Sequence, residues 1–462
     1  MDAVSLSPLL LATAEPAAAV PHYQTWICAA ILVITLVVLA SERIHKTVLA
    51  LLAGGVCLLL GDLWGYFPHD AGHHLPPYIA MIEWEVIGIV IGATVFVEIA
   101  ARSGIFTFLS IRMLKASGGD PFRLLVLFSI LTAVFSAFLD NITAMIIIGS
   151  LTIVACRKLA LDAKPFLITE GIMTNVGGLL TLISSLPNII VGQAAGISYL
   201  DFVIVAGPYT VLATVVTLIV ARFCFGKAVA PLRDPAERRH NRELALAFDE
   251  WETVGSKRFF YTSIVAVVVV ILAFALRPQI PILRDFGIEV VAMGAAVIML
   301  LLHAHDVEED LSHVQWSLVF FFIGLFTLIG VLERAGVLHY IGVALEKLTT
   351  YTGHVGLMWF TAAFSSVTDN IPLAAMLARI FGPTPEAAQA VAPVQWWAIV
   401  FGANLGGNIT PIGSASTVVA VTILKKNGLR ITFLEFVRLG AIFAAAQLLL
   451  GSGYLLILRA IL

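Results

Sequence analysis

Phe135-Ser-Ala-Phe-Leu-Asp-Asn-Ile142 recurs as Phe364-Ser-Ser-Val-Thr-Asp-Asn-Ile371, 229 residues further along the chain. The same separation aligns Asn175-Val-Gly-Gly-Leu-Leu-Thr-Leu-Ile183 with Asn404-Leu-Gly-Gly-Asn-Ile-Thr-Pro-Ile412. Upstream, Ala101-Arg-Ser-Gly-Ile-Phe106 corresponds to Glu333-Arg-Ala-Gly-Val-Leu338 at a separation of 232 residues. Chance similarity between apolar segments does not keep Asp-Asn and Asn-x-Gly-Gly-x-x-Thr in register, so we predict two duplicated halves.

The composition indicates a membrane protein. Of the 462 residues, 60% are hydrophobic and 12% are charged, whereas soluble proteins average about 45–50% and about 25%. Several nearly uncharged stretches, such as 26–40, 202–220 and 436–458, approach the ~20 residues that cross ~30 Å of hydrocarbon as a helix. We therefore predict an all-α polytopic fold of about ten spans in membrane lipid. The net charge of −3 indicates no nucleic-acid partner.

The distribution of Lys and Arg predicts that the two halves have opposite orientations, because short loops rich in these residues stay inside the cell. In the first half, the turn 192–200 carries no Lys or Arg and is expected outside. The matching turn of the second half carries Lys425, Lys426 and Arg430 and is expected inside. The repeat is therefore predicted to be inverted, with both termini outside and the mixed-charge segment 226–258 inside.

These features divide the chain into consecutive segments. They are an N-terminal tail (1–23), two helices (24–80), repeat 1 (81–225), a cytoplasmic linker (226–258), two connecting helices (259–312) and repeat 2 (313–462). Repeat 1 is expected to hold an inner re-entrant hairpin around 122–157 and a broken helix at 165–191. Repeat 2 is expected to hold an outer hairpin around 355–381 and a broken helix at 394–423.

Asp140-Asn141-Ile142-Thr143 and Asp369-Asn370-Ile371-Pro372 are expected at the two hairpin tips, inside the membrane. Irregular backbone at that depth is tolerated only where it is buried in protein or lines a water-filled cavity. A carboxylate there costs about 2.5–3.5 kcal/mol on insertion scales. Two aspartates at equivalent tips therefore indicate a function, and proton binding is the one we predict. The alternative is that each Asp only caps a helix.

The two Asn-x-Gly-Gly segments place Gly, Pro and polar side chains inside otherwise continuous spans, which should break the helices and free backbone groups for binding. Close packing of helices through small residues is the alternative. We predict that substrate or ion binding uses Asp140, Asn141, Thr143, Asn175, Ser184, Ser185, Asn188, Asp369, Asn370, Asn404, Asn408, Thr410, Ser414, Ser416 and Thr417.

Other polar residues fit this symmetric site less well. Glu98 has Gly330 as its repeat partner, so it is either a proton carrier or one member of an ion pair near the interface. His69 and His73 have the i, i+4 spacing of a metal site, but the prolines around them favour a loop, and we predict no metal. His303, His305 and the acidic stretch Asp306–Asp310 are predicted to form a solvated inner loop. No H-E-x-x-H or G-x-S-x-G motif falls in a membrane segment, so we expect neither an enzyme nor a cofactor.

At these motifs the chain resembles the ion transporter superfamily that includes ArsB arsenite permeases, NhaD sodium/proton antiporters, the melanosomal P protein and divalent-anion/sodium symporters. The resemblance runs from about residue 25 to the end and is closest to the ArsB and P-protein branch. It departs where relatives usually read Gly-Asp-Pro-Pro-Asn, because Ser185 occupies the acidic position in Ser184-Ser-Leu-Pro-Asn188. The resemblance implies the bacterial inner membrane and a scaffold domain, including 24–80, beside a mobile transport domain that moves like an elevator. It leaves open a homodimer or a monomer.

The predicted function is secondary active transport, with proton-coupled export of a small inorganic solute such as arsenite or antimonite. No cysteine cluster is available, so such a solute would be held by hydrogen bonds. Na⁺/H⁺ exchange of the NhaD type and a passive ion channel are the alternatives. A dicarboxylate is disfavoured at this point because two aspartates would repel it and no Arg or Lys lies at either motif.

Overall fold

The computed structural model describes residues 20–41, 43–67, 76, 78–303 and 307–461, and the described residues form helices and loops without strands. The first half contains α2 (His22–Ser41), α3 (Lys46–Leu63), η1 (Ile79–Met81), α4 (Trp84–Arg102), α5 (Ile105–Ser117), α6 (Pro121–Ser136), α7 (Asn141–Lys158), α8 (Lys164–Gly177), α9 (Leu186–Ala194) and α10 (Tyr199–Phe225). A linker helix, α11 (Pro235–Leu246), follows.

The second half contains α12 (Lys257–Leu276), η2 (Arg277–Gln279), α13 (Pro281–Arg284), α14 (Ile288–His303), α15 (Val307–Ser312), α16 (Trp316–Arg334), α17 (Val337–Ser365), α18 (Asn370–Phe381), α19 (Pro385–Ala390), α20 (Pro393–Gly406), α21 (Ala415–Lys426) and α22 (Phe433–Ile461). The predicted N-terminal tail is largely outside the described residues, as are the two histidines at positions 69 and 73.

The predicted all-helical polytopic fold is confirmed. Within the described part of the chain, eight helices are long and apolar enough to cross a membrane: α2, α3, α4, α7, α10, α12 with η2, α16 and α22. Of these, α7 is one arm of a hairpin. The other seven, the shorter apolar α14 and the two interrupted helices α8–α9 and α20–α21 make ten crossing elements.

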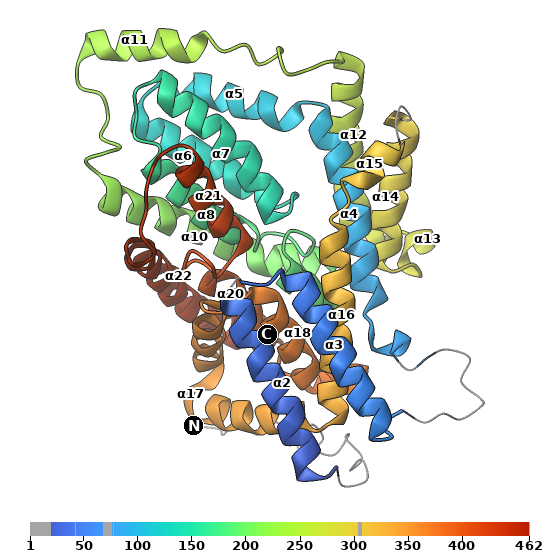
Figure 1. Ribbon diagram of the computed structural model, residues 1–462. Coiled ribbons are helices and arrows are strands. Elements are labelled where there is room, and N and C mark those ends of the chain that lie inside the picture. The colour runs from blue at the N-terminus through green and yellow to red at the C-terminus, as the bar shows by residue number, and fades with distance from the viewer. Residues whose placement is uncertain (1–19, 42, 68–75, 77, 304–306, 462) are drawn as a thin grey trace.

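The two halves place equivalent elements at opposite ends of the molecule. In Figure 1, α5 lies across the upper end, whereas the first part of α17 lies across the lower end. Both follow a glycine in the left-handed region, Gly104 with φ 81° and Gly336 with φ 76°. Within α17 the chain bends at Gly353 (φ 66°), which separates that part from the hairpin arm. The hairpins α6–α7 and α17–α18 thus approach the middle from opposite ends.

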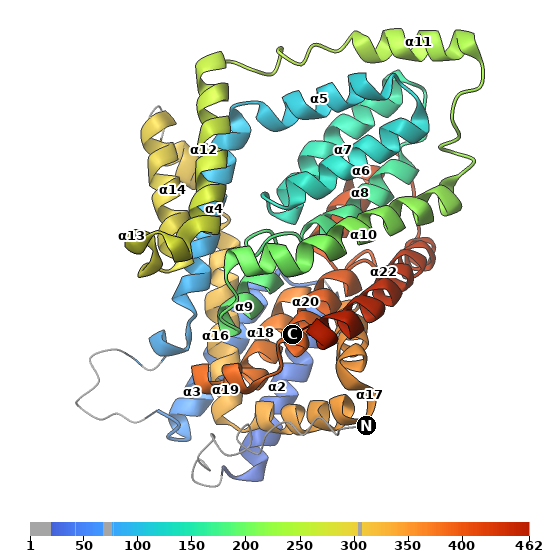
Figure 2. The same cartoon turned by 180° about the vertical axis from the view of Figure 1, so that it is seen from behind.

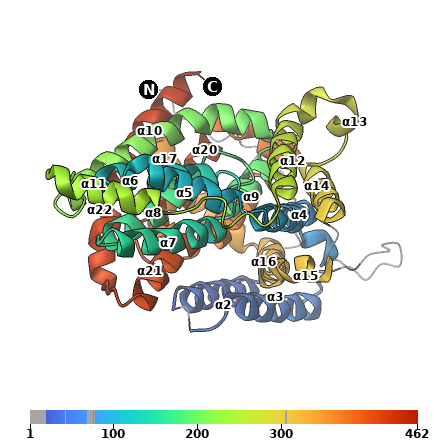
Figure 3. The same ribbon diagram turned by 90° about the horizontal axis from the view of Figure 1, so that it is seen from above.

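The first helices of each half pack against helices of the other half. α3 packs along α16 of the second half, and α14 packs along α4 of the first half. Glycines allow both close approaches: a Cβ added at Gly54 would lie 2.5 Å from the Gly324 carbonyl oxygen, and one at Gly92 would lie 2.5 Å from the Ala292 carbonyl carbon. Figures 2 and 3 show these helices grouped on one side, with α5–α8, α10, α21 and α22 on the other. This packing ties the halves together.

The centre of the molecule is formed by α8 and α20. Every residue from Pro165 to Gly177 and from Val394 to Gly406 is buried. A helix that is buried all round has no solvent-facing stripe, which is why neither segment shows a polar face. Each helix ends at a Gly-Gly pair, where the chain leaves the helix for eight residues before α9 or α21 begins.

Segment 226–258, predicted as a linker between the repeats, packs against α5. It contains α11, and its Trp251 packs against Phe108 of α5 at 4.8 Å between ring centroids. Glu250 bonds to Lys115 of α5 and forms an ion pair with Arg112 at 3.3 Å. The segment therefore lies against the outer surface of α5.

Candidate substrate site

Each hairpin tip is fastened to the broken helix of its own half by the same two hydrogen bonds. In the first half, Ser136 donates to the Thr174 carbonyl and Thr181 to the Ala137 carbonyl, both at 2.6 Å. In the second half, Ser365 donates to the Ala403 carbonyl at 2.7 Å and Thr410 to the Ser366 carbonyl at 2.6 Å. Because these side-chain hydroxyls bond from one segment to the backbone of the other, each tip and its broken helix form one unit.

Asp140 and Asp369 both cap the hairpin helices that they precede. The Asp140 carboxylate accepts from the backbone N–H groups of Ile142 and Thr143 at 3.0 and 3.1 Å, and from the Thr143 hydroxyl at 2.6 Å. Asp369 accepts from the Ile371 N–H at 3.4 Å. The capping alternative is thus observed, and it leaves the second role open because both carboxylates remain half-exposed.

Asparagines link the two halves across the centre. Ser185 donates to the Asn404 side-chain oxygen at 2.7 Å, and at the equivalent place the Asn175 amide donates to the Ser414 hydroxyl at 2.8 Å. Asn404 also donates to Asn188 at 2.9 Å. The broken helix of each half therefore contacts the loop of the other half, in agreement with a pseudo-two-fold arrangement.

The remaining predicted residues support this centre. Asn408 accepts from Asn175 at 2.8 Å and donates to Gln447 at 2.9 Å. Ser416 and Thr417 lie within 3.0 and 3.1 Å of the Ser414 hydroxyl. Gln447, a buried amide of α22, was not predicted, since a lone Gln in a long apolar span resembles many helix-packing residues.

A cavity of about 160 Å³ lies between the hairpin tips and the helices α3, α4 and α16. Seven of the predicted residues line it: Asp140, Asn141, Ser184, Ser185, Asp369, Asn370 and Ser414. The other eight do not: Thr143, Asn175, Asn188, Asn404, Asn408, Thr410, Ser416 and Thr417. These eight form or support the hydrogen-bond network around the cavity. A sequence pattern could not separate the two groups, because only the path of each broken helix decides which side chains face the cavity.

Lys46 also lines the cavity, and its ammonium nitrogen lies 3.1 Å from an Asp369 carboxylate oxygen. The same nitrogen lies 5.4 Å from the centre of the Phe321 ring. The sequence argument against a dicarboxylate rested on the absence of Lys and Arg from both motifs, but Lys46 brings a positive charge to the cavity from another segment. Lys46 is 323 positions from Asp369, so no local pattern pointed to the pair.

Four helix N-termini meet at the same cavity, because residues that begin α7, α9, α18 and α21 all line it. Each N-terminus carries a partial positive charge of roughly half a unit. Together with Lys46, they oppose the two carboxylates. These positive charges at least offset the two carboxylates, so an anionic group is no longer excluded by repulsion.

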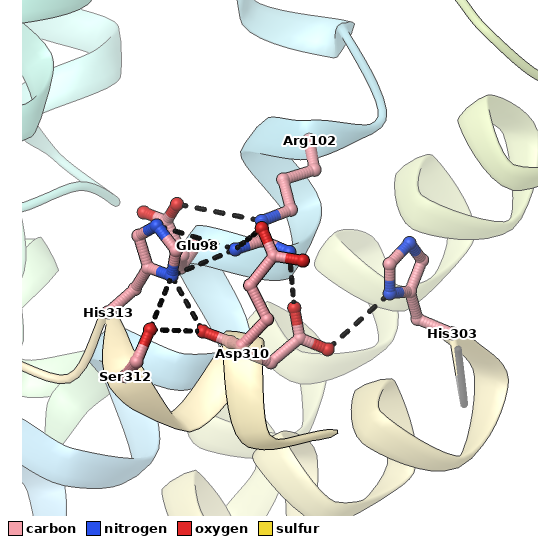
Figure 4. Close-up of polar contacts among 7 residues, drawn as sticks. Glu98, Arg102, His303, Asp310, Ser312 and His313 are labelled. Atoms are coloured by element: carbon pink, nitrogen blue, oxygen red, sulfur yellow. Dashed lines mark hydrogen bonds and ion pairs between the residues drawn. The ribbon is translucent and has the colours of Figure 1, made fainter. Parts of the chain in front are cut away.

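A second polar cluster joins the ends of α4, α14 and α15, away from the cavity (Figure 4). Arg102 lies 2.8 Å from Asp310 and 3.8 Å from Glu98, and His303 lies 3.4 Å from Asp310. Asp310 is 1% exposed, whereas residues 307–309 and 311–313 are exposed, so the predicted solvation holds for its described neighbours but not for Asp310 itself. Glu98 is therefore a member of an ion pair with Arg102, which is the second of the two roles that the sequence left open.

A family model described as "Citrate transporter" matches residues 36–402. The chain belongs to this citrate transporter family. The match confirms the predicted resemblance to the ArsB and NhaD type of ion transporter. An uncharacterized transporter of Mycobacterium tuberculosis is 30% identical over 441 residues, which cover 92% of this chain and 96% of the relative. The human P protein is 26% identical over 508 residues, covering 94% of this chain and 60% of the P protein.

Among solved structures, the YdaH transporter of Alcanivorax borkumensis aligns with a TM-score of 0.59 at 12% identity. The alignment covers 89% of this chain and 98% of that one. At this identity the likeness concerns the fold alone. The family match and the mycobacterial relative identify the molecule as a membrane transporter.

Proposed function

We propose that the protein is a secondary active transporter that exchanges protons for a small, oxygen-rich solute by alternating access. One observation carries the proposal: the capping aspartates of two oppositely directed hairpins, Asp140 and Asp369, line the same cavity. In inverted-repeat transporters, substrate and coupling-ion sites lie at the repeat interface near the midplane. Carboxyl groups at that depth are typical proton carriers. Asp140 and Asp369 are the proposed proton-coupling residues.

Cavities on two sides of the site support alternating access. One, of about 380 Å³, shares Lys46, Asp369 and Ser414 with the central cavity and extends to the α2–α3 turn at Ile44. Another, of about 320 Å³, is lined by Val86 and Ala375. These two residues lie one helical turn from Val90 and Ile371, which line the central cavity. On this side the two cavities are thus separated by only about one helical turn of packed side chains, and this layer is a suitable gate.

Arsenite or antimonite is the first candidate substrate, because both are uncharged trihydroxides at neutral pH. The amides of Asn141 and Asn370 and the hydroxyls of Ser184, Ser185 and Ser414 supply donors and acceptors for such a molecule. Sodium is a weaker candidate, since Lys46 competes with it for Asp369.

A small carboxylate such as citrate is the second candidate. Lys46 and the N-termini of α9 and α21 favour an anionic group, and the family model is described as a citrate transporter. If protonation of Asp369 releases Lys46, the cavity becomes positive and the anion enters together with protons. Proton coupling is then retained, but the direction of transport is import.

The deciding experiment is a substrate screen in proteoliposomes under an imposed pH gradient, with arsenite, antimonite, sodium and citrate. We expect gradient-driven flux of one of these, and its loss in both Asp140→Asn and Asp369→Asn. Counterflow, in which unlabelled solute inside drives uptake of labelled solute, distinguishes a carrier from a passive channel. Full coupled activity in both variants would sink the proposal.

The predicted orientation remains a proposal, with both termini outside a bacterial inner membrane and 226–258 inside. The basic side chains of the 226–258 segment support it. A single cysteine introduced there should resist a membrane-impermeant thiol reagent applied to intact cells, and labelling from outside contradicts the orientation. Monomer and homodimer both remain open, and the mass of the purified protein in detergent decides between them.

A further inference from the structure

Glu170 is a buried carboxyl group that the central site does not use. It lies on α8, and its side chain is fully buried. One of its oxygens accepts a hydrogen bond from the Thr152 hydroxyl of α7 at 2.7 Å. The other, Oε2, is buried without a hydrogen-bond partner in the described structure. An ionised carboxylate at such a place costs several kcal/mol, whereas a protonated one has a hydrogen of its own to donate.

No charge compensates Glu170. Within the described residues it forms no ion pair, and the titratable group that interacts with it is the Cys156 thiol on α7. The helices that pack against α8 are α6, α7, α10, α20 and α21. Their basic residues lie in terminal turns and do not bond to Glu170: Arg123, Arg157, Lys158, Arg222, Lys425 and Lys426.

The internal repeat provides a control for the structural importance of this carboxyl group. At the separation of 229 residues, Glu170 corresponds to Ile399 and Thr152 to Phe381, and both are buried. An apolar pair therefore fills the equivalent place in the second half. The fold requires a buried side chain there but not an acid, so a role in packing alone does not explain Glu170.

Glu170 lies between the cavity and one end of the molecule. Along α8 it is about 7.5 Å from Asn175, which bonds to Asn141 of the tip, and about 9 Å from Lys164 at the helix start. The Ser416 hydroxyl connects Asn175 to the Gly171 carbonyl, with distances of 3.3 and 3.2 Å. Ser416 in turn contacts Ser414, which lines the cavity. The polar network around the site thus ends one residue from Glu170.

We propose that Glu170 is a proton-binding site that exchanges protons between the central cavity and the end of the molecule where α8 begins. The inference rests on the proposed proton coupling and adds a residue to its path. Because the second half has Ile399 instead, this route exists on one side only. Protons reach or leave the cavity through α7 and α8 on that side, with the Thr152 hydroxyl as a hydrogen-bond partner that can pass a proton.

The first test does not depend on transport. Infrared spectra of the reconstituted protein at neutral pH should contain the carbonyl absorption of a protonated carboxyl group that is lost in Glu170→Gln. The band should shift in Thr152→Val, because its hydrogen bond is removed. Glu435→Gln is the matched control, since it removes a carboxyl that pairs with Lys164 at the surface, and it should leave the band unchanged. Absence of any difference between wild type and Glu170→Gln overturns the proposal.

The second test measures flux in proteoliposomes, with arsenite and citrate as parallel probes. In Glu170→Gln and Glu170→Ile we expect loss of pH-gradient-driven flux, while substrate counterflow is retained. Retention of full gradient-driven flux in both variants also overturns the proposal. If the wild-type protein moves neither probe under a gradient, the proposed function fails at that point, and the infrared result still reports on Glu170.

Discussion

At the scale of single residues, position in the fold decides the role more than residue type does. Asp140 and Asp369 are equivalent in sequence, yet only Asp369 is paired with a lysine. Ser185 occupies the position where the family resemblance led us to expect an acid, and here it donates to the Asn404 side-chain oxygen. The cavity is therefore less symmetric than the motifs that build it.

Removal of the Lys46 charge should impair transport. We expect Lys46→Met to lower substrate flux about tenfold, because a hydrogen bond to a charged group is worth about 1.5–3 kcal/mol and 1.4 kcal/mol is a factor of ten. Lys46→Arg should retain more activity. Arg43→Met removes the same charge from the same turn, at an exposed position that does not line the cavity. Equal flux in all three variants contradicts a role for Lys46 in the site.

At the scale of elements, glycines set how closely the helices of the transport site pack. Gly177 lies against the backbone of α6, and its counterpart Gly406 lies against α17. Added Cβ atoms at these positions would lie 2.4 and 2.3 Å from the carbonyl oxygens of Ala133 and Ala362. Because backbone atoms cannot turn away as side chains do, these contacts hold each broken helix at a fixed distance from its hairpin.

Gly406→Ala should therefore destabilise the protein by about 1–3 kcal/mol, the usual cost of overpacking a filled interior. Gly453→Ala on α22 is the control, since nothing lies within 4 Å of its added Cβ. We expect a lower midpoint of thermal unfolding in detergent for Gly406→Ala and little change for Gly453→Ala. Identical midpoints for the two variants would show that α20 and α17 can separate without loss of stability.

At the scale of the whole molecule, the segment between the halves is fastened to the first half. The hydrogen bond from Lys115 holds the pKa of Glu250 below its ordinary value of 4.5, with further help from Arg112. A carboxylate with a lowered pKa stabilises the folded state above its ordinary pKa, and the contribution is lost as the pH falls through the lowered pKa. The contact is thus fully present at neutral pH and lost only in acid.

Glu250→Gln should loosen the linker at neutral pH. We expect faster amide hydrogen exchange in residues 247–256 and in α5 of the variant, with the difference from wild type shrinking as the pH falls below 4.5. Glu252→Gln is the control, because this neighbouring side chain is exposed. Unchanged exchange in Glu250→Gln, or a difference that persists in acid, would place the attachment elsewhere, for example in the contact of Trp251 with Phe108.

The sequence alone determined the architecture. Apolar length predicted the spans, register between repeats predicted the duplication, and the Asp-Asn tips and Gly-Gly breaks predicted where irregular backbone occurs. These signals are local, because membrane insertion and helix breaking depend on neighbouring residues. The sequence reasoning did not identify three residues: Lys46, Gln447 and Glu170. Each is a single polar residue in an otherwise ordinary segment, without a repeat counterpart of the same kind.

The tertiary structure decided which side chains line the cavity. It paired Lys46 with Asp369 across 323 positions, turned seven of the fifteen predicted residues toward the cavity, and left Glu170 between the site and one end of the molecule. The physical reason is that electrostatic balance is set by distance in space. Helix N-termini, a lysine and two carboxylates contributed by distant parts of the chain meet only after the two inverted halves have packed together.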